Sequence, residues 1–115
     1  MAKGNDYVRW FENLGKDDVP LVGGKNASLG ELLRGLKEQG VRVPDGFATT
    51  SDAYREFIRA NELEEKIRAE LEDLERNRKT LSKVGRAIRR MIRNGSFPEE
   101  IDPAIRESYR ELSKR

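Results

Sequence analysis

Four residues near the N-terminus have the types and the order needed to hold a phosphate group. Gly23, Gly24, Lys25 and Asn26 stand directly before a segment with helical periodicity. The first turn of a helix exposes unpaired N–H groups and carries a partial positive charge, so it attracts anions. Glycines there let the backbone approach a phosphate closely, and a lysine adds a compact mobile cation. The turn is therefore a candidate phosphate-binding site.

The turn does not match the P-loop pattern G-x-x-x-x-G-K-[ST]. Asn26 follows the lysine where that pattern has Ser or Thr, and Val19 stands five residues before Gly24 where it has glycine. Two glycines and a lysine are also typical of an ordinary exposed turn. On these residues alone, the plain turn is the favoured interpretation.

The spacing of apolar residues predicts a predominantly helical α+β fold, with a few short strands near the N-terminus and about five helices. Short strands are expected within residues 7–14 and 47–50, and Val41 and Val43 alternate with a polar residue as a strand would. A helix is expected from residue 25 or 26 to 39, where Leu29, Leu32, Leu33 and Leu36 form one apolar stripe. Further helices are expected at 51–60, from just after 61 and at 80–93, and a last helix is expected to end at about 112.

Several residues indicate where these helices begin or end. Gly40 is a typical stop for the first helix. For the other helices, the expected N-terminal residues are Ser51, Asn61 with Glu64 as a capping box, Thr80, and Asp102 followed by Pro103 at the first helical position. In the helix after Thr80, the residues expected to face inward are Leu81, Val84, Ile88, Met91 and Ile92.

The composition restricts the chemistry that the chain can perform. Its 115 residues suffice for a single domain or a part of one, with 36% apolar and 38% charged residues. There is no cysteine and no histidine, which excludes disulfides, thiolate metal sites and a phosphohistidine on this chain. No apolar run approaches the ~20 residues that span a bilayer, and no signal region is present. We therefore expect a cytoplasmic protein with no membrane partner.

The charged residues separate into two adjacent runs, which we expect to form a helical hairpin over about residues 61–94. Residues 61–75 are mainly acidic, whereas 76–93 contain eight Lys and Arg residues and no acid. If the two helices fold back on each other, the acidic helix lies along the basic one and offsets much of its positive electrostatic field. Nucleic-acid binding is therefore disfavoured. A docking surface for neighbouring domains is a third interpretation.

The chain contains two motifs in order, VGGKNASLGELL and GVRVPDGFATTSDAY, and the segment VRWFENLG before them. Together they give a resemblance to a known family that covers about residues 7–112. The chain resembles the N-terminal nucleotide-binding segment of the pyruvate, water dikinase (phosphoenolpyruvate synthase) family. Pyruvate, phosphate dikinases and rifampin phosphotransferases have a similar layout. The resemblance implies part of an ATP-grasp-like domain of an ATP-dependent phosphotransferase, which forms AMP, phosphoenolpyruvate and phosphate from ATP, pyruvate and water.

By that resemblance, Lys25 contacts the ATP phosphates, Gly23 and Gly24 shape the approach, and Asn26 belongs to the same turn. The resemblance implies no ligand contact for Pro44–Thr50, where Phe47 is expected in the core. It places the phosphohistidine, the pyruvate site and the Mg²⁺ ligands on later parts of the enzyme, and no catalytic or metal residue here. We therefore expect partnership with those remaining domains and no catalysis by this chain alone. The alternatives are a related pyruvate, phosphate dikinase-type enzyme and a non-catalytic interaction module.

Overall fold

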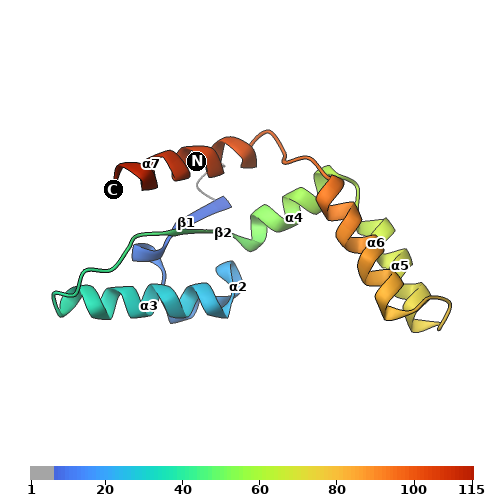
Figure 1. The fold of residues 1–115 in the computed structure, drawn as a ribbon, viewed down its shortest axis with the longest axis horizontal. Helices are drawn as coiled ribbons and strands as arrows, with labels where there is room; N and C mark the ends of the chain where they lie inside the picture. Colours follow the sequence, from blue (N-terminus) through green and yellow to red (C-terminus); the bar gives the residue numbers. More distant parts are fainter. Residues whose placement is uncertain (1–6) are drawn as a thin grey trace. The chain divides into compact units, whose positions relative to one another are not determined.

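The computed structural model describes residues 7–115 and confirms the predominantly helical α+β class (Figure 1). The chain divides into two compact units: the described residues up to Tyr54 together with Glu99–Arg115, and Arg55–Pro98. The elements in chain order are β1 (Val8–Trp10), η1 (Phe11–Asn13), η2 (Lys16–Asp18), α2 (Val19–Val22), α3 (Gly24–Glu38), β2 (Phe47–Thr49), α4 (Ser51–Ala60), α5 (Glu64–Glu75), α6 (Leu81–Asn94) and α7 (Ile101–Lys114).

A two-stranded sheet lies at the centre of the first unit. β1 and β2 pair antiparallel with Trp10 opposite Phe47, and these two rings pack with their centroids 5.5 Å apart. Both expected strands are confirmed, and Phe47 is half-buried. Residues 41–46 contain no strand, so the alternation of Val41 and Val43 was misleading. Figure 1 shows α3 and α7 on opposite sides of this sheet.

The helix α3 packs onto the rest of the first unit through its small residues. Its buried residues are Ala27, Gly30 and Leu33. A Cβ atom on Gly30 would lie 2.5 Å from the Cβ of Leu14 and 2.7 Å from its carbonyl oxygen, and Leu14 is fully buried. A side chain at position 30 would therefore force α3 away from the core.

Gly40 ends α3 as predicted. Its φ of +79° is in the left-handed region, where glycine carries no steric cost. The N–H of Gly40 donates to the carbonyl of Lys37, and the N–H of Val41 donates to that of Leu36, both at 3.0 Å. This pair of bonds is a Schellman motif.

In the second unit, α5 and α6 pack side by side as an antiparallel hairpin (Figure 1). Leu63 and Val84 are buried there, and the rings of Phe57 and Phe97 lie 5.7 Å apart. The prediction for α6 holds for Val84 but is wrong for Leu81 and Ile92, which are 72% and 36% exposed.

The helix starts were predicted with mixed success. Thr80 caps α6, since its hydroxyl accepts the N–H of Lys83 at 3.2 Å. The expected cap at Ser51 was wrong, because Thr50 accepts the N–H of Ala53 and Ser51 is already the first residue of α4.

The expected capping box at Asn61 was also wrong. The amide of Asn61 instead donates to the carbonyls of Phe57 and Ser96 and accepts the N–H of Ser96, each at 2.9 Å. These bonds tie the segment after α6 to the end of α4 within the second unit. A residue that looked like a local cap therefore makes a contact between distant segments.

Pro103 is not the first residue of the last helix, which the sequence had indicated it to be. α7 begins at Ile101 with Glu100 at its N-cap, so Pro103 lies in the first turn, where its missing N–H costs nothing. Asp102 is inside the helix and forms an ion pair with Arg106, with 2.7 Å between Oδ1 and Nε. The expected cap at Asp102 is therefore corrected to a side-chain pair within the first two turns.

Candidate phosphate-binding turn

The turn from Gly23 to Asn26 joins α2 to α3 and has a backbone that requires glycine at its first position. Gly23 has φ +85° and ψ 162°, a region that only glycine adopts readily. Its N–H donates to the carbonyl of Val19 at 2.8 Å, and its carbonyl accepts the N–H of Ala27 at 3.1 Å. Gly23 therefore both ends α2 and opens α3.

The first turn of α3 is open to solvent. The N–H groups of Gly24, Lys25 and Asn26 precede the first hydrogen bond of the helix, and none has a backbone acceptor in the described part of the chain. A Cβ atom on Gly24 would meet nothing within 4 Å. Within residues 7–115, the space beside Gly24 at the start of α3 is therefore open, and an anion site requires such an open approach.

Lys25 is exposed on this turn. Within residues 7–115 its ammonium group makes no hydrogen bond or ion pair. A lysine without an acidic partner is free to move toward an incoming anion, since no carboxylate has to be displaced first. The cation and the open N–H groups thus lie at one end of one helix.

Asn26 has a supporting position in this turn. Its side-chain amide donates to the carbonyl of Val22 at 3.0 Å. That carbonyl lies at the end of α2, so the bond fixes the two helices around Gly23. One of the two N–H donors of the Asn26 side-chain amide is therefore used within the protein.

Ser51, a residue of the second sequence motif, supports the same turn by hydrogen bonds to the helix that precedes it. The hydroxyl of Ser51 lies 2.9 Å from the carbonyl oxygen of Pro20 and 3.1 Å from that of Leu21, and donates to this pair. Both carbonyls belong to α2. The start of α4 thus anchors the helix that leads into the glycines, and sequence analysis did not identify this contact.

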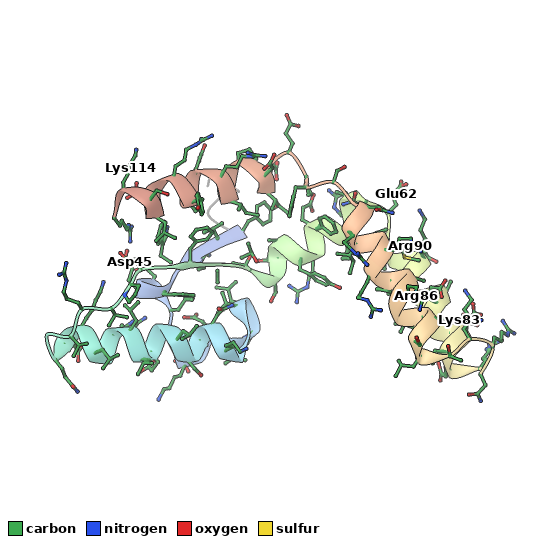
Figure 2. All side chains as sticks on the ribbon, in the orientation of Figure 1. Asp45, Glu62, Lys83, Arg86, Arg90 and Lys114 are labelled. Atoms are coloured by element: carbon green, nitrogen blue, oxygen red, sulfur yellow. The ribbon has the colours of Figure 1, made fainter. Side chains whose placement is uncertain are left out.

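The Pro44-Asp45-Gly46 segment before β2 is irregular and is held by contacts within the protein. The Asp45 carboxylate lies 3.6 Å from the ammonium of Lys37 and 3.2 Å from the guanidinium of Arg115, which also lies 3.9 Å from the centre of the Trp10 ring. Figure 2 labels Asp45 beside the end of α7. A Cβ atom on Gly46 would approach the Phe11 ring to 2.6 Å.

The second unit contains two oppositely charged helices, but the acidic α5 does not neutralise the basic α6. The ion pairs of α5 are made with cations of α5 itself and of the turn after it, such as Glu72 with Arg76 and Glu70 with Lys79. The exposed cations of α6 have no ion pair with any described residue: Lys83, Arg86, Arg89, Arg90 and Arg93. Figure 2 labels three of them along the helix.

The pKa of Lys79 is raised above its ordinary value because its ammonium group donates to the Glu70 carboxylate, at 2.9 and 3.1 Å from the two oxygens, and Asp73 adds to this. This group lies at the turn between α5 and α6. Its position after a left-handed Asn77, with φ +59°, lets it reach back to the helix before the turn.

Two negative findings concern metals and membranes. Among residues 7–115, no group of three or more Asp or Glu side chains is arranged to hold a metal ion. The Asp18 carboxylate accepts the N–H of Gly15 at 2.9 Å, so that acid is part of a turn. No described helix is both long and apolar enough to cross a bilayer.

The geometry so far shows an open helix start with an exposed lysine on a mostly helical scaffold, and comparison with known proteins gives the chain a family. Residues 19–115 match the family model described as the AMP/ATP-binding domain of pyruvate phosphate dikinase. The chain belongs to this family.

Several curated relatives carry one name. The chain is 49% identical over 109 residues to the phosphoenolpyruvate synthase of Neisseria meningitidis, a match that covers 94% of this chain. It is 44% identical to that of Escherichia coli over 107 residues, or 92% of this chain, and 40% identical to that of Aquifex aeolicus over 116 residues, or 100% of this chain. The chain spans 14% of the length of each of these three proteins.

Proposed function

We propose that this chain is the N-terminal, ATP-phosphate-contacting portion of a phosphoenolpyruvate synthase (pyruvate, water dikinase). In this proposal residues 1–115 form one subdomain of an ATP-grasp-like nucleotide-binding domain, with the α5–α6 hairpin as part of it. The match to an AMP/ATP-binding family and the shared name of the relatives support the proposal. The whole enzyme would form AMP, phosphoenolpyruvate and phosphate from ATP, pyruvate and water in the cytoplasm.

The observation that carries the proposal is the free ammonium group of Lys25 at the open start of α3. A helix N-terminus whose N–H groups are covered by side chains of the same protein cannot bind a ligand. Here the first three N–H groups are unpaired, the lysine has no acidic partner among residues 7–115, and a Cβ on Gly24 would meet only open space. Phosphate oxygens would replace water on these donors.

Each residue of the turn would have a separate task. Gly23 would turn the chain out of α2, and Gly24 would keep the approach to the N–H groups free of side chains. Lys25 would neutralise phosphate charge. Asn26 would fix the turn through its bond to Val22 at 3.0 Å.

The rest of the site would come from outside this chain. One cation and a few N–H groups are too few to hold a nucleotide triphosphate against water, and the described acidic residues do not assemble a Mg²⁺ site. The Mg²⁺ ligands, and the histidine that this sequence lacks, would belong to the remaining domains. In isolation the chain would be inactive and would bind ATP weakly or not at all.

The alternative is a pyruvate, phosphate dikinase-type enzyme, which is the enzyme that the description of the matching family names. The relatives at 40–49% identity are named phosphoenolpyruvate synthases, and this favours water as the acceptor. A non-catalytic interaction module is disfavoured on the same grounds.

The test is a chimera of the E. coli phosphoenolpyruvate synthase in which the matching segment is replaced by this chain. In an active chimera, Lys25→Met is expected to lower kcat/KM for ATP by roughly tenfold or more, since a charge-assisted hydrogen bond contributes about 1.5–3 kcal/mol. Gly24→Ala is expected to weaken ATP binding as well, because its new methyl group would stand in the approach to the N–H groups.

Lys83→Met is the matched control, because Lys83 is also an exposed helical lysine without a partner in the described chain. It should leave ATP kinetics unchanged. Equal kinetics for the Lys25 and Lys83 variants would contradict the proposal. If the chimera does not fold, amide NMR of the isolated chain with millimolar ATP is the second test, and shifts confined to α6 would count against the turn.

A further inference from the structure

The face of α3 that carries Lys25 also carries three leucines, of which two are exposed in the described chain and one is half-buried. Lys25, Leu29, Leu32 and Leu36 stand at positions i, i+4, i+7 and i+11, which places them on one stripe of the helix. Leu29 is 42% exposed and Leu32 is 57% exposed. The core instead receives the opposite side of the helix, with Ala27, Gly30 and Leu33.

A groove runs along the same helix and continues the apolar surface. Its lining includes Val19, which is 47% exposed, together with Leu32 and Leu36, and two glycines, Gly24 and Gly35. A Cβ atom on either glycine would meet nothing within 4 Å. A segment lying in this groove could therefore approach the backbone of α3 closely at Gly35, as closely packed helices do at small residues.

Scattered exposed leucines are normal in soluble proteins, but a continuous stripe on one helix usually marks an interface. We propose that this stripe, Leu29, Leu32 and Leu36 with Val19 at its edge, is the docking surface for an aliphatic face of the same enzyme's remaining polypeptide. The inference rests on the proposed function, since it takes this chain to be one part of such an enzyme. Docking there would also restrict the orientation of the Lys25 side chain, which lies at the end of the stripe.

The choice of occupant follows from the relatives. Each of the three described above matches nearly all of this chain and has most of its length outside the match. A covalently linked segment has a high effective concentration, so a modest apolar surface is enough to hold it. A second copy of this chain is a weaker candidate, because a stable dimer needs about 1,200 Å² or more of buried surface and one helix stripe supplies a few hundred.

The experiment measures the reactivity of a thiol introduced by Leu32→Cys, because this chain has no cysteine of its own. The thiol should react rapidly with a maleimide in the isolated chain. In the E. coli chimera the same thiol, followed by peptide mass spectrometry, should react about tenfold or more slowly, and denatured chimera should restore the fast rate. Equal rates in the isolated chain and the folded chimera would overturn the proposal.

A second measurement distinguishes the proposed occupant from the other possible occupants. It can also be made if the chimera does not fold. The E. coli enzyme lacking its matching segment, added in trans to the isolated Leu32→Cys chain, should slow the thiol reaction. Protection that instead grows with the concentration of the isolated chain alone, together with a dimer in analytical ultracentrifugation, would identify a second copy and overturn the proposal. Neither readout uses ATP, so the role of Lys25 is tested separately by the kinetics of Lys25→Met.

Discussion

The hydroxyl of Ser51 lies 2.9 Å from the carbonyl oxygen of Pro20, 31 residues earlier in the chain. This bond joins the second of the two motifs on which the family resemblance rests to the helix α2, which leads into the first motif. One motif supplies the glycine-lysine turn, and the other supplies the residue that anchors the helix before it. The structure thus gives the second motif a role in positioning the first, although it has no assigned ligand contact.

Ser51→Ala is expected to destabilise the first unit by about 1 kcal/mol, because two carbonyls of α2 lose their side-chain donor. Hydrogen exchange should also become faster in the segment from Val19 to Lys25. Chemical denaturation and exchange mass spectrometry measure the two effects. Ser113→Ala is the control, since Ser113 is exposed and its hydroxyl only reaches back to the carbonyl of Tyr109 in its own helix. Similar exchange rates in both variants would rule out an anchoring role for Ser51.

Two glycines of α3 should respond in opposite directions to the same substitution. Gly30→Ala places a methyl group 2.5 Å from the Leu14 Cβ, and such overpacking costs about 1–3 kcal/mol. Gly35→Ala meets nothing within 4 Å and should stabilise the isolated chain by roughly 0.5–1 kcal/mol through helix propensity. Urea denaturation of both variants measures the difference. Equal stabilities would mean that α3 does not pack on Leu14 as described.

The same helix shows what the sequence could and could not predict. The leucine spacing correctly predicted a helix at this position, and Gly40 correctly predicted its end. The leucines identified the buried face only in part, since Leu33 is buried together with Ala27 and Gly30, whereas Leu29 and Leu32 are exposed. Residue type indicates which faces can be buried, but only the surrounding chain decides which face is buried here.

The candidate site was predicted in part. Gly23, Gly24 and Lys25 could be singled out because their chemistry is local to the turn, and their contact with a phosphate stays a prediction. The contributions of Ser51 and Asn61 were missed because they depend on partners about 30 residues away, which a cap-like pattern does not reveal. The charges of α5 and α6 were also misjudged, since complementary sequence runs do not specify which side chains meet.

Lys79 makes a pH-dependent contribution to the stability of the second unit. The pKa of Lys79 in the folded protein is raised above 10.5, chiefly by its hydrogen bond to Glu70. A group with a raised folded pKa stabilises fully below its unfolded pKa and loses this contribution as pH rises through the folded value. The stability difference between the wild type and Lys79→Met should therefore be constant from about pH 7 to 9 and shrink above 10.5.

Denaturation at several pH values tests this prediction, with Lys83→Met as the control. Lys83 has no acidic partner in the described chain, so its substitution should change stability little at any of these pH values. A Lys79→Met difference that increases above pH 10.5 would have the wrong sign and would contradict the ion pair with Glu70.

The unpaired cations of α6 lead to the last prediction. Arg90 stands four residues after Arg86 and three before Arg93, so like charges are neighbours on the helix surface, and each such pair costs roughly 0.2–0.5 kcal/mol. Arg90→Glu replaces two repulsions by two attractions and should raise the Tm of the chain at low salt, with Arg90→Gln giving a smaller rise. Because exposed charges are screened, both gains should diminish as NaCl increases from about 20 to 500 mM. Thermal unfolding followed by circular dichroism measures this, and a lower Tm for Arg90→Glu at low salt would mean that α6 already has an anionic partner at this position.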